Sequence, residues 1–393
     1  MKKVMHFGAG NIGRGFFGHL YHESGYHIIF VDIVDEVIKI INEMAQYPIW
    51  IVGDKVEKIV IDNISGISLK DEKKIIDIGA DLDLISFSVG ANNVKGITPI
   101  LAKIIEKKFS SENSGFLNII IGENLKNASS IVGQWINQHL QENFSHIMKD
   151  KVGLVETVLS RMVPIVPDEL KKQYPLLVLV EPYKTMPVAK NMFKGAPPNI
   201  NGFLMVDNIK PYEAMKLYIH NFTHAAFAYA GHKKNYKYIW EVVKDKKIEN
   251  LVRNAYLEIK SAIHRNYGIE DEEIEAYYRD LLERFSNKAL GDTIIRVARE
   301  PIRKLGPEER IIGAAKLCQE QGIIPEYVCF FAACCLHYDE PTDIESQKLK
   351  TLVSTEGIDS VLKNISGLDE KNPIFIRIKE NYINFWKKWE KVL

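Results

Sequence analysis

The segment KKVMHFGAGNIGRGFF, residues 2–17, places Gly8, Gly10 and Gly13 directly after an apolar run. This G-x-G-x-x-G spacing lies between a predicted strand, 4–9, and a predicted helix, 11–24, and is typical of a loop that binds the pyrophosphate of a dinucleotide. The glycines permit a tight turn, close approach of the backbone to a ligand, and close packing of helix on strand. The helix N-terminus adds N–H donors and a partial positive charge. The segment therefore predicts a Rossmann-type domain.

Asp32 ends the next predicted strand, 27–32, 19 residues after Gly13. A carboxylate there accepts hydrogen bonds from the adenosine ribose and repels a 2′-phosphate, which favours NAD over NADP. A turn that only packs, with Asp32 as a helix cap, is the weaker interpretation. Two interpretations of Arg14 remain open: a contact with a phosphate, or a solvated side chain. The expected NAD-binding residues are Phe7, Gly8, Ala9, Gly10, Asn11, Ile12, Gly13 and Asp32.

Strand and helix patterns alternate through the first half of the chain, which predicts a doubly wound, mainly parallel sheet covered on both faces. A hairpin insertion is expected at 50–62, and the apolar segments 152–158 and 176–183 are expected to extend the sheet. From Pro211 onward helical patterns dominate. We therefore expect an α/β NAD-binding domain at 1–195, with added strands, and an all-α substrate and catalytic domain at 196–393.

Composition narrows the classes of function. The 393 residues carry 51 basic and 51 acidic side chains, so no net field recruits nucleic acid or a membrane surface. Neither a signal peptide nor a membrane span is evident. Four cysteines, Cys318, Cys329, Cys334 and Cys335, match no zinc spacing and are interpreted as buried thiols of a cytoplasmic protein. No metal is expected, and the expected partner is a small molecule bound by a monomer or small homo-oligomer.

The predicted helix 210–232 carries Lys216, Asn221 and His224. On an α-helix they share a face about 140° wide. Oxidation of an alcohol by hydride transfer needs a base for the hydroxyl proton, and a lysine whose pKa burial has lowered can supply it. Asn221 and His224 can orient the oxygen. On these residues alone, a solvated lysine and a core histidine are the stronger interpretation.

Several stretches together resemble the polyol-specific long-chain dehydrogenase family. They are HFGAGNIGRGF at the start, GENL (122–125), FKGAPPNI (193–200), the K-x4-N-x2-H signature, REPIRKL (299–305) and NISGLD (364–369). The resemblance implies metal-independent chemistry with Lys216 as general acid and base. It implies that Asn124 and Asn221 hold the reacting oxygen and that His224 positions it. The implied reaction is the reversible oxidation of D-mannitol 1-phosphate to D-fructose 6-phosphate with NAD.

One departure from the family pattern lies at Ser160, which stands where relatives commonly carry an acid; Arg161 is retained, and Glu156 is a candidate to compensate. Arg299, Arg303 and Lys304 are candidates for the substrate phosphate, because guanidinium groups suit phosphate oxygens. Two alternatives stay open. One is a related reductase of a free ketose or sugar acid, of the fructuronate reductase or mannitol 2-dehydrogenase type. The other is an NAD-binding sensor without catalysis.

Overall fold

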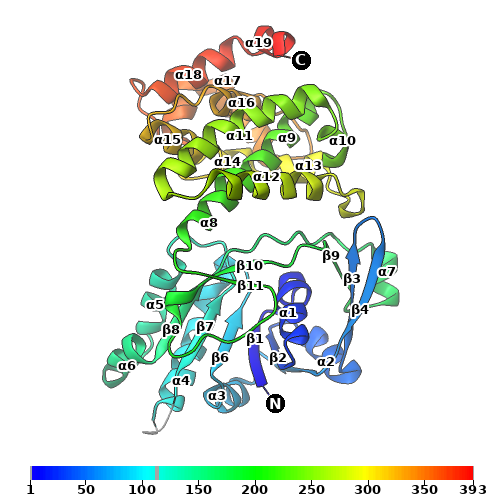
Figure 1. Cartoon of the computed structure of the whole chain (residues 1–393), viewed down its shortest axis with the longest axis vertical. Helices are drawn as coiled ribbons and strands as arrows, with labels where there is room; N and C mark the ends of the chain where they lie inside the picture. Colours follow the sequence, from blue (N-terminus) through cyan, green and yellow to red (C-terminus); the bar gives the residue numbers. More distant parts are fainter. Residues whose placement is uncertain (1, 111–114, 393) are drawn as a thin grey trace. The chain divides into compact units, whose positions relative to one another are not determined.

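The computed structural model describes residues 2–110 and 115–392. The chain divides into two compact units, Met1–Ile209 and Lys210–Leu393. The first unit is built on a parallel sheet with helices, and the second consists of helices (Figure 1). The predicted fold class, an α/β Rossmann-type domain followed by a helical domain, is confirmed.

The first unit has a six-stranded parallel sheet in the order β5-β2-β1-β6-β7-β8. This is the order of two βαβαβ halves, whose strands diverge between β1 and β6 and leave a ligand crevice at their carboxyl ends. The strands are β1 (Lys2–Phe7), β2 (Tyr26–Asp32), β5 (Ile64–Ser68), β6 (Leu84–Phe87), β7 (Leu117–Ile121) and β8 (Val152–Glu156).

Two apolar cores cover the two faces of this sheet, because successive β1 side chains point to opposite sides. Val4 belongs to one core, whereas Met5 and Phe7 belong to the other. The helices of the unit are α1 (Gly18–Glu23), which continues a π-helical segment at Gly13–Phe17, α2 (Asp35–Met44), α3 (Glu72–Ala80), α4 (Val94–Lys108), α5 (Ala128–Asn137), α6 (Ser145–Asp150) and α7 (Asp168–Gln173).

A second, three-stranded sheet corrects one expectation. The hairpin of β3 (Tyr47–Val52) and β4 (Val56–Ile61) forms as predicted, but β9 (Val178–Val180) pairs with β3 and does not extend the main sheet. A run of apolar residues predicts a buried strand without naming its neighbour. A further parallel pair joins β10 (Met186–Ala189) to β11 (Phe203–Val206).

The second unit is built around a long helix formed by α8 (Lys210–Ala214), a π-helical segment at Met215–Asn221, and α9 (Phe222–Lys233). It packs against α11 (Lys246–Tyr267) and α16 (Glu326–Leu336), and nine of the eleven residues of α16 are buried. The other helices are α10 (Ile239–Val242), α11 (Lys246–Tyr267), α12 (Asp271–Phe285), α13 (Ile294–Ala298), α14 (Pro301–Lys304), α15 (Ile312–Glu320), α16 (Glu326–Leu336), α17 (Ile344–Asn364), kinked at Gly357, α18 (Pro373–Ile383) and α19 (Phe385–Val392).

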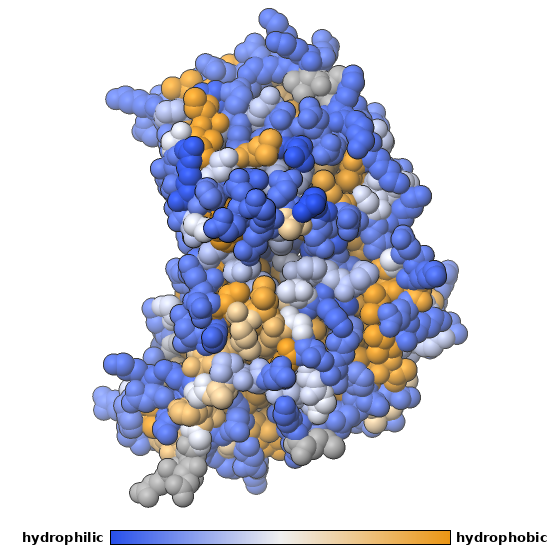
Figure 2. Space-filling model, viewed as in Figure 1, coloured by the Kyte–Doolittle hydropathy of each residue, from blue (hydrophilic) through white to orange (hydrophobic). Residues whose placement is uncertain are grey.

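The surface drawn in Figure 2 is mostly hydrophilic, and apolar side chains form separate areas on it. Exposed apolar side chains include Val56 and Val60 on the edge strand β4, where charged Glu57 and Lys58 lie beside them. Charged residues on an edge strand oppose pairing with other chains. Within the described residues, none of the helices has the length and apolar character needed to cross a membrane.

His6, on β1, lies beneath the glycine loop. Its Nδ1 is 2.7 Å from Ser86 Oγ and its Nε2 is 2.9 Å from Ser88 Oγ. The ring is fully buried and also contacts Phe17 and Phe30. Burial lowers the pKa of His6 to about 3, so the folded protein holds a neutral imidazole. The two serines satisfy both ring nitrogens in that form.

This burial predicts a loss of stability in acid. The unfolded chain protonates His6 near pH 6.5, whereas the folded chain resists protonation until about pH 3. The stabilisation is therefore complete above pH 6.5 and declines as pH falls, by roughly 2 kcal/mol at pH 5 for this group. Urea unfolding of the unsubstituted protein and of His6→Asn between pH 5 and 8 should show a shallower pH dependence in the variant. Parallel curves would contradict the assignment.

Candidate active site

The glycine loop after β1 has two packed glycines and one open glycine. Gly8 has φ +100°, and a Cβ there would lie 2.5 Å from the Ser88 carbonyl oxygen. A Cβ on Gly13 would lie 1.8 Å from the Gly8 carbonyl oxygen. Around Gly10, which is exposed, no atom lies within 4 Å of an added Cβ. Gly8 and Gly13 therefore shape the loop, and Gly10 leaves open the side from which a diphosphate can approach.

Asp32 holds this loop at the end of β2. Its Oδ2 accepts a hydrogen bond from the Ala9 amide at 2.6 Å, and its Oδ1 accepts one from the Val34 amide at 2.9 Å. Val34, not Asp32, is the N-cap residue of α2. The carboxylate therefore joins the glycine loop to the start of α2, and the interpretation of Asp32 as a helix cap is wrong.

Arg14 is buried, so the interpretation as a solvated side chain is also wrong. Its guanidinium donates to the Ala9 carbonyl, and its own carbonyl accepts a hydrogen bond from the Tyr47 hydroxyl at 2.8 Å. Burial lowers the pKa of Arg14, while Tyr47 and Asp32 counteract it. Of the other predicted cofactor residues, Phe7 and Ala9 are buried, Ile12 is half-buried and Asn11 is exposed.

Asn124 is exposed in the loop after β7. The neighbouring Glu123 accepts a hydrogen bond from the Gly90 amide at 2.7 Å, and burial raises the pKa of Glu123. The loops after β6 and β7 are thereby joined. Asn124 thus lies on loops at the carboxyl ends of the strands, where open α/β sheets bind ligands.

Lys216 and Asn221 both lie in the π-helical segment Met215–Asn221. A π turn is closed by an i→i+5 hydrogen bond, so residues five apart lie one above the other. An ordinary α-helix would separate Lys216 and Asn221 widely around its axis. The half-buried Lys216 has its Nζ 3.1 Å from Nδ1 of His220, which lies one turn further along the helix. Burial, with Lys216 and Arg284, lowers the pKa of His220, so the neutral ring accepts a hydrogen bond from the lysine.

His224 follows on α9, and its ring stacks on Phe285 at 4.7 Å between centroids. Its Nε2 lies 2.8 Å from Oδ2 of the buried Asp292, whose Oδ1 accepts a hydrogen bond from Arg296. Burial, followed by the charges of Arg296 and Lys216, lowers the pKa of His224. The ring is therefore neutral and stacked on Phe285, and its Nε2, although close to Asp292, makes no hydrogen bond among the described residues. Sequence reasoning missed Asp292 and Phe285, which come from other parts of the unit.

The basic candidates for phosphate binding differ in their surroundings. The backbone leaves the helix at Arg299 and Glu300 before Pro301 begins α14, so Arg296, Arg299 and Arg303 do not line one helix. Arg299 is exposed, and Glu300 lies 3.7 Å from it. Arg303 is paired with both Glu300 and Glu309. Lys304 is buried and donates to the Arg299 carbonyl, and burial lowers its pKa to about 8.

The residues around Ser160, the position where relatives commonly carry an acid, also have defined contacts. Ser160 is buried. Glu156 accepts hydrogen bonds from the amide and the hydroxyl of Ser129. The carboxylates whose charges act on Arg161 are those of Glu181 and Glu23. Among residues 2–110 and 115–392, no three His, Cys, Asp or Glu side chains gather where they could hold a metal ion.

A dinucleotide-type loop in one unit and a lysine–histidine helix in the other define a two-domain dehydrogenase architecture. The chain matches the mannitol dehydrogenase Rossmann domain over residues 2–202 and the mannitol dehydrogenase C-terminal domain over residues 208–386. It belongs to the mannitol dehydrogenase family, which confirms the resemblance to polyol-specific dehydrogenases.

Individual relatives are similar over nearly their full length. The chain is 35% identical to a mannitol-1-phosphate 5-dehydrogenase of Caldanaerobacter subterraneus subsp. tengcongensis, covering 97% of this chain and 98% of that protein. It is 33% identical to one of Bacillus subtilis, covering 94% and 97%. Among solved structures, it is similar to Pseudomonas fluorescens mannitol 2-dehydrogenase in a ternary complex with NAD and D-mannitol. That match has a TM-score of 0.75 at 16% identity and covers 100% and 93% of the two chains. A D-sorbitol dehydrogenase matches with a TM-score of 0.82 at 14% identity, covering 99% and 94%.

Proposed function

We propose that this protein reversibly oxidises D-mannitol 1-phosphate to D-fructose 6-phosphate with NAD. The observation that carries the hydride-transfer chemistry is the Lys216–His220 pair inside the π-helical segment, together with the neutral His224 stacked on Phe285. The sugar-phosphate substrate is inferred from the whole-length similarity to enzymes named for that activity. The first unit would carry the cofactor, and the second would carry the catalytic lysine.

In this proposal the neutral Lys216 amine takes the proton of the substrate hydroxyl during oxidation. The carbon of that hydroxyl loses a hydride to the nicotinamide ring, which is the chemistry that NAD supplies when bound, and a carbonyl remains. In reduction the protonated amine returns the proton. His220 Nδ1 keeps the amine in place, and Asn221, His224 and Asn124 orient the reacting oxygen. No metal takes part in these steps.

The cofactor part of the proposal is supported by the loop geometry. The open side at Gly10 and the amides at the start of the helix would receive the diphosphate. The Asp32 carboxylate already accepts two amide hydrogen bonds, and its remaining lone pairs would accept those of the adenosine ribose hydroxyls. Its charge would repel the 2′-phosphate of NADP.

For the substrate phosphate we propose the basic turn of Arg299, Arg303 and Lys304. Arg299 and Arg303 are both exposed, but Arg303 already pairs with the two carboxylates of Glu300 and Glu309, whereas Arg299 lies 3.7 Å from Glu300. Arg299 is therefore the residue expected to contact the phosphate most directly. We also propose a cytoplasmic location, since the four cysteines are free and buried, as suits a reducing compartment. As for assembly, we propose a monomer or small homo-oligomer.

The substrate is tested by NADH oxidation with fructose 6-phosphate, fructose and fructuronate. We expect kcat/KM to be at least about a hundredfold higher for fructose 6-phosphate than for fructose, because a charge-assisted bidentate contact contributes a few kcal/mol. Arg299→Met should reduce this advantage and leave the fructose rate unchanged. Preference for a free sugar would favour the alternative reductase, and no turnover of any of the three would favour the sensor.

A second test concerns the preference for NAD over NADP, which we attribute to Asp32. Asp32→Asn keeps an acceptor for the Ala9 amide but removes the charge, whereas Asp32→Ala removes both. Both variants should use NADP relatively better than the unsubstituted protein, and Asp32→Ala should also bind NADH about tenfold or more weakly. Equal use of NAD and NADP by the unsubstituted protein would refute the assignment.

Lys216 is tested through its protonation. Polyol oxidation should rise with pH, because it needs the neutral amine, whereas ketose reduction should hold or fall. Lys216→Ala should lower kcat in both directions by roughly a hundredfold to ten-thousandfold. Its NADH affinity should stay near that of the unsubstituted protein, because the glycine loop belongs to the other unit. If Lys216→Ala keeps most of its kcat, another group must transfer the proton, and His224 would be tested next.

A further inference from the structure

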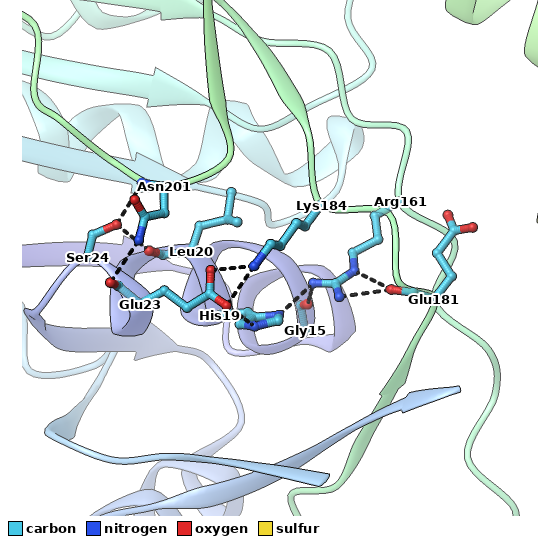
Figure 3. Close-up of polar contacts among 9 residues, drawn as sticks. All are labelled: Gly15, His19, Leu20, Glu23, Ser24, Arg161, Glu181, Lys184 and Asn201. Atoms are coloured by element: carbon cyan, nitrogen blue, oxygen red, sulfur yellow. Dashed lines mark hydrogen bonds and ion pairs between the residues drawn. The ribbon is translucent and has the colours of Figure 1, made fainter. Parts of the chain in front are cut away.

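Arg161 is a buried guanidinium, far from the glycine loop in sequence, that contacts the helix of that loop (Figure 3). It donates two hydrogen bonds to the Glu181 carbonyl, at 3.0 and 2.8 Å. Its NH1 also donates to the Gly15 carbonyl at 2.9 Å and lies 2.9 Å from His19 Nδ1. One side chain therefore joins the segment that follows β8 to the first turns of the helix after the loop.

Burial of this charge is costly, and the contacts around it are the compensation. Burial lowers the pKa of Arg161 to about 10, and the carboxylates of Glu181 and Glu23 counteract the effect. Glu181 also fixes the adjacent backbone, because its carboxylate accepts the Met162 amide hydrogen bond. A side chain held by so many fixed partners has little freedom to move.

The Gly15 carbonyl lies inside the π-helical segment Gly13–Phe17. In a π turn the ordinary i→i+4 pattern is interrupted, so some carbonyls need partners from outside the helix. Here Arg161 serves the Gly15 carbonyl, and the Tyr47 hydroxyl serves the neighbouring Arg14 carbonyl. Both carbonyls are within two residues of Gly13, whose amide region would face the dinucleotide.

The contacts of Arg161 continue along the helix through His19. Because an arginine only donates, His19 Nδ1 must accept, and the ring proton lies on Nε2. Nε2 is 3.0 Å from the Glu23 carboxylate, which also accepts two hydrogen bonds from Lys184 at 2.8 Å. Asn201 then binds the Glu23 carbonyl at 3.0 Å. The chain between β8 and β11 is thus fastened to the whole length of this helix (Figure 3).

We propose that Arg161 is a positioning residue of the dinucleotide site, which fixes the π turn after Gly13 and so aims the loop amides at the diphosphate. The inference rests on the proposed function, since it assumes that this loop binds NAD. The Arg161 guanidinium is already engaged by the Glu181 and Gly15 carbonyls and by His19, so it would act on the cofactor through the loop. Its loss should therefore weaken cofactor binding and leave the hydride transfer step at saturating cofactor largely unchanged.

The test measures NADH binding to the full-length protein by fluorescence titration, beside thermal unfolding and kcat at saturating NADH. Arg161→Met should weaken NADH binding at least about tenfold, equivalent to about 1.4 kcal/mol. Arg161→Lys should be intermediate, because an ammonium replaces only part of the guanidinium fork. Tyr47→Phe, which removes the hydroxyl donor to the Arg14 carbonyl, should weaken NADH binding in the same direction and keeps the test open where Arg161→Met does not fold.

Lys108→Met is the matched control. Lys108 is a buried cation of the same unit. It donates to the Leu82 carbonyl at 2.8 Å, just before the N-terminal end of β6, whereas the glycine loop lies at the carboxyl ends of the strands. This variant should lower the unfolding temperature and leave NADH affinity unchanged. If Arg161 had a purely structural role, Arg161→Lys would behave like this control, with a lower unfolding temperature and unchanged NADH affinity. Normal NADH affinity in folded Arg161 variants would therefore overturn the inference. Failure of the unsubstituted protein to bind NADH would instead overturn the proposed function.

Discussion

The hydrogen bond from the Ala9 amide to the Asp32 carboxylate connects the ends of two adjacent strands, and the geometry of the glycine loop depends on that connection. It can form only because β1 and β2 pair in parallel, with Phe7 opposite Val31. It also requires Gly8, since a side chain at φ +100° would collide with the Ser88 backbone. At the carboxyl ends of β1 and β2, the strand register, the turn conformation and the position of the acid therefore depend on one another.

Each of the two units contains a π-helical turn among its candidate functional residues. One follows Gly13 in the first unit, and the other carries Lys216 and Asn221 in the second. Such turns are rare and are frequent at functional sites. The first leaves carbonyls for Tyr47 and Arg161, and the second brings side chains five residues apart onto one line. In each case a local deviation from α-helical geometry produces an arrangement that a regular helix does not provide.

The glycine fingerprint, the acid after β2 and the alternating apolar runs were sufficient to predict the fold class, because these features are local in sequence. Pairing of β9 with β3 was not predictable, since an apolar run does not name its partner strand. The short strand β5 and helix α3 were also missed. At the candidate site, Lys216, Asn221 and His224 could be named from their spacing, but Asp292 and Phe285 could not, because tertiary packing alone brings them to His224.

The partners of the first helix come from distant parts of the chain: the Gly15 carbonyl binds a side chain 146 residues later, and the Arg14 carbonyl binds one 33 residues later. Contacts at such separations form late in folding, because the chain entropy of closing the intervening loop must be overcome first. During synthesis the glycine loop leaves the ribosome long before Arg161, which lies 146 residues after Gly15. The glycine loop is therefore made well before the partners that hold the first turns of its helix, and it must wait for them to reach its final geometry.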